Sequence, residues 1–175
     1  MGNLFVHSHF DYSDKKTFIS LYKQHVRCHL EYASPVWNPW TLNDKNLIEK
    51  VQIKAVNMVH GLTGKTYEEK LAELKLDSLE TRRRKADLIQ AFKIIRGFND
   101  VDRSTWFEFA NQNNTVIQTR SSSHPLNLRK KRCNTEIKKN FFSNRVVDDW
   151  NALPSHVKES STIKLFKANL TNINY

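Results

Sequence analysis

The stretch Asp77–Gly97, which reads DSLETRRRKADLIQAFKIIRG, decides the fold. Asp77 followed by Glu80 is a typical start of a helix, and Gly97 is a typical end. Between them, apolar residues recur at the three- and four-residue spacing of a helix that buries one face: Leu88, Ala91, Phe92 and Ile95. The stretch therefore predicts a long amphipathic helix that buries these four residues.

Further helical patterns lie before this stretch. A first helix is expected over residues 14–33, and Pro35 would end it, because the residue before a proline avoids helical angles. Asn43 or Asp44 can cap a second helix. The apolar faces that we expect to be buried are Phe18, Tyr22, Val26, Leu30 and Ala33 in the first helix, and Leu47, Val51, Ala55 and Met58 in the second. Gly61 would end this second helix.

A third helix is expected after Thr66, which forms a capping-box pattern with Glu69. Residues 111–134 are polar, basic and serine-rich and predict a loop or arm, within which Leu126–Leu128 alternates like a short strand. Two more helical patterns follow, with the apolar faces Phe142, Val146, Trp150 and Leu153, and Ile163, Phe166, Leu170 and Ile173.

The predicted fold class is therefore mainly α: a helical bundle-like domain with a basic, largely irregular segment, with room for short strands, before the last two helices. The predicted parts are a helical region over residues 1–110, a basic polar arm or loop over 111–140, and a C-terminal helical segment over 141–175 that packs back on the core.

The charge of the chain predicts an anionic partner. The 175 residues include 28 Lys and Arg against 18 Asp and Glu, a net charge of +10. Residues 111–175 alone hold 11 basic and 4 acidic side chains, and most of the excess lies between Arg120 and Arg145. Because like charges packed together repel unless an anion offsets them, RNA or DNA, contacted through phosphates, is the expected partner.

Other classes are disfavoured by composition. Two cysteines exclude a disulfide-rich scaffold. No apolar run approaches the ~18 residues of a membrane span, so no membrane partner is expected. The first residues lack the basic and long apolar regions of a secretory leader, so we expect an intracellular protein, with nucleus and cytoplasm both open.

Three short motifs suggest chemistry, but each has a plainer interpretation. The run from Gly61 to Thr66 lacks the first glycine and the preceding strand of a phosphate-binding loop, which favours a turn. His25 and His29 share a helix face without further ligands at zinc-like spacing. Asp148-Asp149 lies in an amphipathic helix rather than on a hairpin turn, which favours surface polarity over magnesium binding. We predict no catalytic residue, metal or cofactor in this chain.

Several blocks in fixed order resemble one family, the non-LTR (LINE-type, jockey-like) retrotransposon reverse transcriptases, in their carboxy-terminal region. The blocks are LYK (21–23), HVR (25–27), HLEYASPVWNP (29–39), LIEKVQ (47–52), YEEKL (67–71), LETRR (79–83), DLI (87–89), FFSNRVV (141–147) and WNALP (150–154). Cys28 stands where this family usually has a proline.

The resemblance implies a fragment of an RNA-directed DNA polymerase that lacks the catalytic part. In this family the polymerase carboxylates lie upstream, in a palm domain that this chain would contact. The chain resembles the thumb-like helices, here residues 1–110, and the region beyond them, which in related elements help to hold template RNA and target DNA.

The candidate nucleic-acid-binding residues are the basic side chains Arg129, Lys130, Lys131, Arg132, Lys138, Lys139 and Arg145, followed by Arg82, Arg83, Arg84 and Lys85. The alternative is a truncated relic that acts only as a helical protein-interaction or scaffold segment. An independent enzyme, such as a nuclease, is disfavoured because the sequence assembles neither metal ligands nor a nucleophile with a base.

Overall fold

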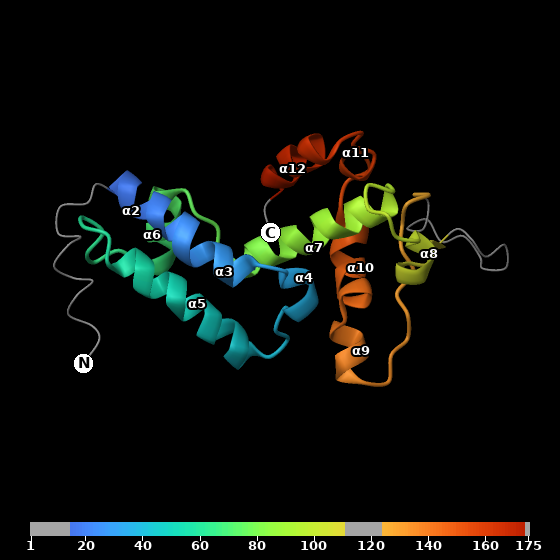
Figure 1. The fold of residues 1–175 in the computed structure, drawn as a ribbon, viewed down its shortest axis with the longest axis horizontal. Coiled ribbons are helices and arrows are strands. Elements are labelled where there is room, and N and C mark those ends of the chain that lie inside the picture. The colour runs from blue at the N-terminus through green and yellow to red at the C-terminus, as the bar shows by residue number, and fades with distance from the viewer. Residues whose placement is uncertain (1–14, 111–123, 174–175) are drawn as a thin grey trace. The chain divides into compact units, whose positions relative to one another are not determined.

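The computed structural model describes residues 15–110 and 124–173 and confirms the mainly helical fold class (Figure 1). The chain divides into two compact units. Unit 1 comprises Met1–Ser34 and Pro39–Arg82, and unit 2 comprises Pro35–Asn38 and Arg83–Tyr175. Among the residues described, no helix combines the length and the apolar character needed to cross a membrane. The boundaries predicted at residues 110 and 140 stay a prediction.

Unit 1 is built from helices α2 (Lys15–Leu21), η1 (Tyr22–Arg27), α3 (Cys28–Glu31), α5 (Leu42–Asn57) and α6 (Tyr67–Leu74). The first three are continuous in sequence and correspond to the predicted first helix, with a π-helical stretch at η1. This helix ends at Glu31, two residues before the predicted end at Ala33, and Pro35 is not what ends it. Ala33 has a left-handed φ of 51°, while Pro35 lies inside the short helix α4 (Ser34–Trp37). Pro35 fits in the first turn of α4 because the backbone N–H groups of a first turn have no partner within the helix, so the missing N–H of proline costs no hydrogen bond.

The buried face of α5 also differs from the prediction. Leu47, Val51 and Met58 are exposed, whereas Gln52 and Val56 are completely buried. Gln52 can be buried because its amide is hydrogen-bonded: it accepts from the Tyr22 hydroxyl at 2.7 Å and donates to the Asp77 carbonyl at 3.0 Å. A prediction from the spacing of apolar residues does not take account of buried polar residues such as Gln52. It therefore predicted the wrong buried face for α5.

Capping signals in the sequence predicted the start of α6 correctly but the ends of α5 incorrectly. Thr41, rather than Asn43 or Asp44, caps α5 by accepting from the Asp44 N–H at 3.2 Å. The helix ends at Asn57, before the predicted stop at Gly61. The capping box at Thr66 is confirmed in full, with both reciprocal bonds to Glu69.

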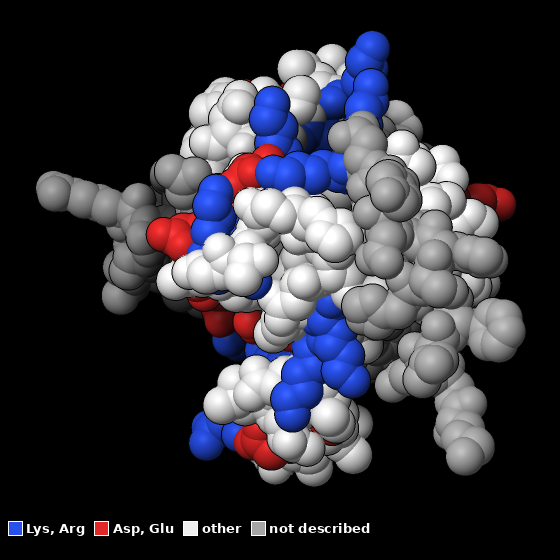
Figure 2. Space-filling model, turned by 90° about the vertical axis from the view of Figure 1, so that its left-hand side faces the viewer, with Lys and Arg blue, Asp and Glu red and all other residues white. Residues whose placement is uncertain are grey.

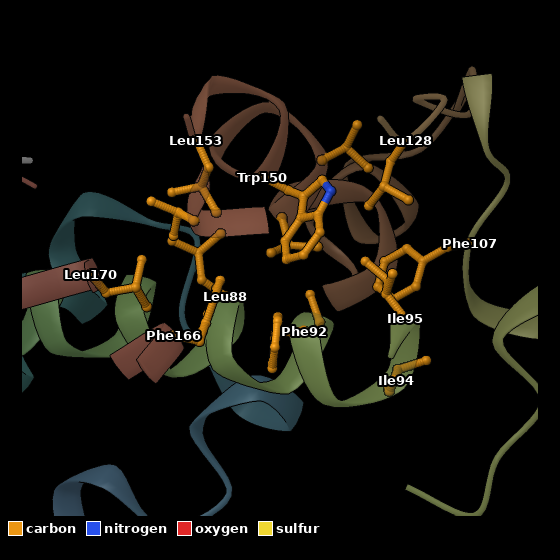
Figure 3. Packing of buried hydrophobic residues seen from close by; sticks show 14 of the residues in the cluster. Leu88, Phe92, Ile94, Ile95, Phe107, Leu128, Trp150, Leu153, Phe166 and Leu170 are labelled. Atoms are coloured by element: carbon orange, nitrogen blue, oxygen red, sulfur yellow. The ribbon is translucent and has the colours of Figure 1, made fainter. Parts of the chain in front are cut away.

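Unit 2 contains the larger core. Helix α7 (Leu79–Ile95) begins in unit 1 and continues through unit 2, where it is followed by α8 (Arg103–Trp106), α9 (Glu136–Asn140), α10 (Phe142–Ala152), α11 (Ser155–Lys158) and α12 (Ile163–Thr171). The predicted core residues of α7 are confirmed: Leu88, Ala91, Phe92 and Ile95 are all buried. Figure 3 shows this face of α7 turned toward Trp150 of α10 and Phe166 of α12.

The Phe92 and Phe166 rings stack with centroids 4.1 Å apart, and Trp150 is completely buried beside them. The apolar faces of the two late helices are thus confirmed at Phe142, Val146, Trp150, Leu153, Phe166 and Leu170. Among the described residues, the short helix α9 lies inside the stretch 111–140 that was predicted as an irregular arm, and three helices follow that stretch instead of the two predicted. The short helices α9 and α11 were missed because they carry little periodic signal. The expected strand is a single antiparallel bridge between Phe109 and Leu128.

Candidate nucleic-acid interface

The basic run Arg129–Arg132 lies on an irregular segment that runs antiparallel to α10 within unit 2 (Figure 1). Asn151 of α10 holds the start of this segment with two bonds of 2.9 Å, one to the Leu128 N–H and one to the Leu128 carbonyl. Asn144, two helical turns earlier, accepts from the Lys131 N–H at 3.2 Å. We call the segment Leu128–Cys133 the clamped basic segment.

The spacing of these two clamps stretches the segment. Seven residues of α-helix advance by about 10.5 Å. The three residues from Leu128 to Lys131 can span that distance only when they are nearly fully extended, at about 3.3–3.6 Å each. In extended chain, successive side chains point to opposite sides. Lys130 accordingly pairs with Asp148 of α10, while Lys131 lies 3.3 Å from Glu108 on the other neighbouring segment.

Hydrogen bonds on both sides fix the segment further. The Arg129 N–H donates to the Glu108 carbonyl at 2.7 Å, and the Ala110 N–H donates to the Asn127 carbonyl at 2.9 Å. The Trp150 indole N–H donates to the Leu126 carbonyl at 2.8 Å. The backbone that carries the basic side chains is therefore held by a helix face on one side and by a bridge on the other.

A buried lysine supports the start of the segment. Lys158 is 2% exposed, and its ammonium group donates to the Asn127 side-chain oxygen and to the Asn151 carbonyl, both at 2.9 Å. Burial lowers the pKa of Lys158. Its two oxygen acceptors are neutral, so this contact positions the segment without neutralising its charge.

Six of the predicted residues have exposed side chains in unit 2. Arg129, Arg132 and Lys138 have no side-chain partner among the described residues. Three others form ion pairs with acids that are themselves exposed: Lys130 with Asp148, Lys131 with Glu108, and Lys139 with Glu136. Such surface pairs contribute about 0–1 kcal/mol, so a phosphate can replace the carboxylate. Figure 2 draws the side that lies on the left in Figure 1, and on that side too basic side chains lie directly beside acidic ones.

Arg145 has a different environment from these six. Its guanidinium donates to both carboxylate oxygens of Asp87, at 2.8 and 2.9 Å, and also to the carbonyls of Pro35 and Asn140. Asp87 is 4% exposed. Burial raises the pKa of the Asp87 carboxyl, and the Arg145 guanidinium opposes that rise. Arg145 therefore joins α7, α4 and the end of α9 to α10.

The second basic cluster, Arg82 to Lys85, is also engaged in the fold. Arg82, in unit 1, donates to both oxygens of Glu31, and this bond raises its pKa. Arg83 is 1% exposed. Arg84 pairs with Asp149 through two bonds of 2.6 and 3.1 Å, and Lys85 is half-buried. The structure does not bring this cluster to the surface as one exposed group.

The other motifs fall in plain structural settings. Asp148 and Asp149 of the acidic pair bind the separate cations Lys130 and Arg84. Lys65 of the glycine-containing turn pairs with Glu73. Trp37 and Trp40, on either side of Pro39, are 40% and 52% exposed. Over residues 15–110 and 124–173, no group of three or more His, Cys, Asp or Glu could hold a metal ion.

Sequence reasoning missed the residues that organise the site. Asn144 and Asn151 are seven residues apart and so share one face of α10, a spacing that was visible in the sequence. They lie among the apolar residues of that helix, where a buried polar side chain needs hydrogen-bond partners. Two asparagines on one face of an amphipathic helix could therefore have predicted that another segment bonds to them.

Comparisons with known proteins give no match. No protein-family model matches the chain, and no significant similarity was found to a curated protein or to a solved structure.

Proposed function

We propose that this chain is a nucleic-acid-binding carboxy-terminal region of a non-LTR retrotransposon reverse transcriptase. Its part would be to hold template RNA or target DNA by phosphate contacts, while polymerisation takes place in a palm that this sequence does not include. The observation that carries the proposal is the clamped basic segment, where four consecutive basic residues are exposed on a fixed backbone.

Two physical features of this segment support binding. Its backbone is already held in place, so little chain entropy is lost when a strand binds. Its carboxylate partners are exposed and weakly bound, so phosphates can displace them. Helix α9, which follows the clamped basic segment in the sequence, adds two further exposed basic residues, Lys138 and Lys139.

The experiment is a salt titration of binding. Affinity of the full chain for fluorescent RNA and DNA oligonucleotides is measured by anisotropy at several salt concentrations. Replacing Arg129, Lys130, Lys131 and Arg132 together by alanine should flatten the slope of log affinity against log salt by up to about 0.9 for each phosphate that the variant no longer binds.

A matched control removes the same charge elsewhere. Lys50, Lys54, Lys164 and Lys167 are exposed and have no side-chain partner among the described residues. Their replacement by alanine should leave most of the slope in place. A wild-type interaction that is absent or insensitive to salt would overturn the proposal, as would an equal reduction of slope in the control.

One observation favours the alternative of a protein-interaction segment. The face of α5 that was predicted to be buried is exposed, with Leu47 at 52% and Val51 and Met58 at 37%. Exposed apolar surface of this kind is typical of a missing partner. Light scattering and sedimentation test it: self-association that the double variant Leu47→Gln, Val51→Gln removes would favour this function, and a monodisperse monomer would count against it.

A further inference from the structure

An exposed aromatic ring lies at the junction of α9 and α10, next to the basic residues. Phe141 is 54% exposed and separates helix α9 from helix α10. Its ring stacks nearly parallel on Trp106 of α8, with 9° between the planes and 6.2 Å between the centroids. This offset stacking is a favourable geometry for two aromatic rings.

The stack continues from the surface into the core of unit 2. Trp106 contacts the edge of Phe142, with centroids 6.1 Å apart and planes at 69°. Phe142 is 5% exposed and meets Phe107 in a second edge contact at 5.9 Å. Phe141 is therefore a ring that is held in place from below and open to solvent above.

Basic residues lie close to this ring in the sequence. Lys138 and Lys139 of α9 precede it by three and two residues and are exposed, whereas the charge of Arg145 in α10 is offset by Asp87. On the other side of the stack, Glu108 follows Trp106 by two residues and pairs with Lys131 of the clamped basic segment. An apolar platform bordered by cations fits a ligand that has both flat rings and negative charge.

We propose that Phe141 is a base-stacking platform, and that the ligand of this surface is single-stranded nucleic acid. This inference rests on the function proposed above and specifies its substrate class. The bases of an unpaired strand can stack on the open face of Phe141 while its phosphates contact Lys138, Lys139 and the clamped basic segment. In a duplex the bases are already stacked on one another, so their flat faces are not open to the ring.

The experiment separates the base from the phosphate. Binding of the full chain is measured against a 12-nucleotide oligo-dT, an abasic strand of the same length and charge, and a 12-base-pair duplex. Phe141→Ala should weaken binding to oligo-dT by about 5- to 150-fold, which is the contribution of one stacked base. It should leave both the affinity for the abasic strand and the salt slope for oligo-dT unchanged.

Two variants and one control guard against loss of the fold. Phe141→Trp should keep the affinity, and Phe141→Leu, which is apolar without a ring, should lose it. Phe98→Ala is the matched control, because Phe98 is 47% exposed and also stacks on a core ring, Phe92, at 5.7 Å. Circular dichroism should show the same helix content in all of these variants.

The outcomes distinguish this inference from the proposed function. If wild type binds no strand at low salt, the proposed function fails. If wild type binds strands with a salt dependence but Phe141→Ala binds oligo-dT normally, or weakens oligo-dT and the abasic strand equally, the platform is refuted and the phosphate interface stands. A preference for the duplex over oligo-dT would also refute it.

Discussion

Asn151→Ala is the substitution that most directly tests the clamped basic segment. It removes the two bonds of 2.9 Å to the backbone of Leu128, a residue that is 3% exposed. A net hydrogen bond contributes about 0.5–1.5 kcal/mol, and each buried group left unsatisfied costs about 1–3 kcal/mol. Partial compensation by water leaves an expected decrease of about 2–4 kcal/mol in the stability of the bridge region.

Amide hydrogen exchange measures this decrease where it occurs. The N–H groups of Arg129 and Ala110 bond to other residues, so the substitution does not touch their partners. Their protection should fall by about 30- to 700-fold, since 1.4 kcal/mol corresponds to a factor of ten. Affinity for oligonucleotides should fall as well, because the basic side chains lose their fixed backbone.

The control is Asn140→Ala, which removes one exposed bond, from Asn140 to the Glu136 carbonyl. It should change the same protection factors by less than about twofold. If Asn151→Ala leaves the exchange of Arg129 and Ala110 at the level of this control, then Asn151 does not hold the segment and the reasoning is wrong.

Three further predictions concern the fold. Arg145→Ala should destabilise unit 2 by about 3–5 kcal/mol in urea unfolding, because it leaves the buried carboxylate of Asp87 without its cation; a decrease below about 1 kcal/mol would mean that the pair is dispensable. Thr66→Ala should lower the stability of unit 1 by about 0.5–2 kcal/mol by removing the capping box, whereas Thr66→Ser should restore most of it. Lys158→Met should flatten the pH dependence of stability on the alkaline side. Because burial lowers the pKa of Lys158, the unfolded chain binds more protons between that lowered pKa and about 10.4, so wild-type stability should rise with pH there; equal slopes in wild type and variant would contradict this.

The sequence predicted the helices of unit 2 well because their burial follows simple periodicity. Phe92, Trp150 and Phe166 are large, apolar and repeated at helical spacing, so each predicted face is the buried one. Unit 1 was harder because its α5 buries Gln52, whose partners come from Tyr22, Tyr67 and Asp77. No local pattern reports bonds between residues 15 to 30 positions apart.

The candidate site shows a similar division. Composition identified the basic segment, but charge alone could not distinguish Arg129, which faces solvent, from Arg145, which is bound to Asp87. That distinction depends on which acidic residues the fold brings near. The predicted apolar face included Phe142 but not Phe141, and the structure agrees: Phe142 is buried and Phe141 is exposed, because the chain is extended at Phe141 before α10 begins. The contact of Phe141 with Trp106 joins residues 35 positions apart, and no local pattern predicted it.

The two asparagine clamps also restrict how this chain can change in length. Only Arg129 and Lys130 lie between the clamped residues Leu128 and Lys131. Deleting one of them would leave a reach of about 7 Å for a gap of about 10.5 Å. Inserting one would turn the following side chains to the opposite side. Lysine and arginine can therefore replace one another here, but a codon cannot be gained or removed without breaking a clamp or reversing the side from which the charges project.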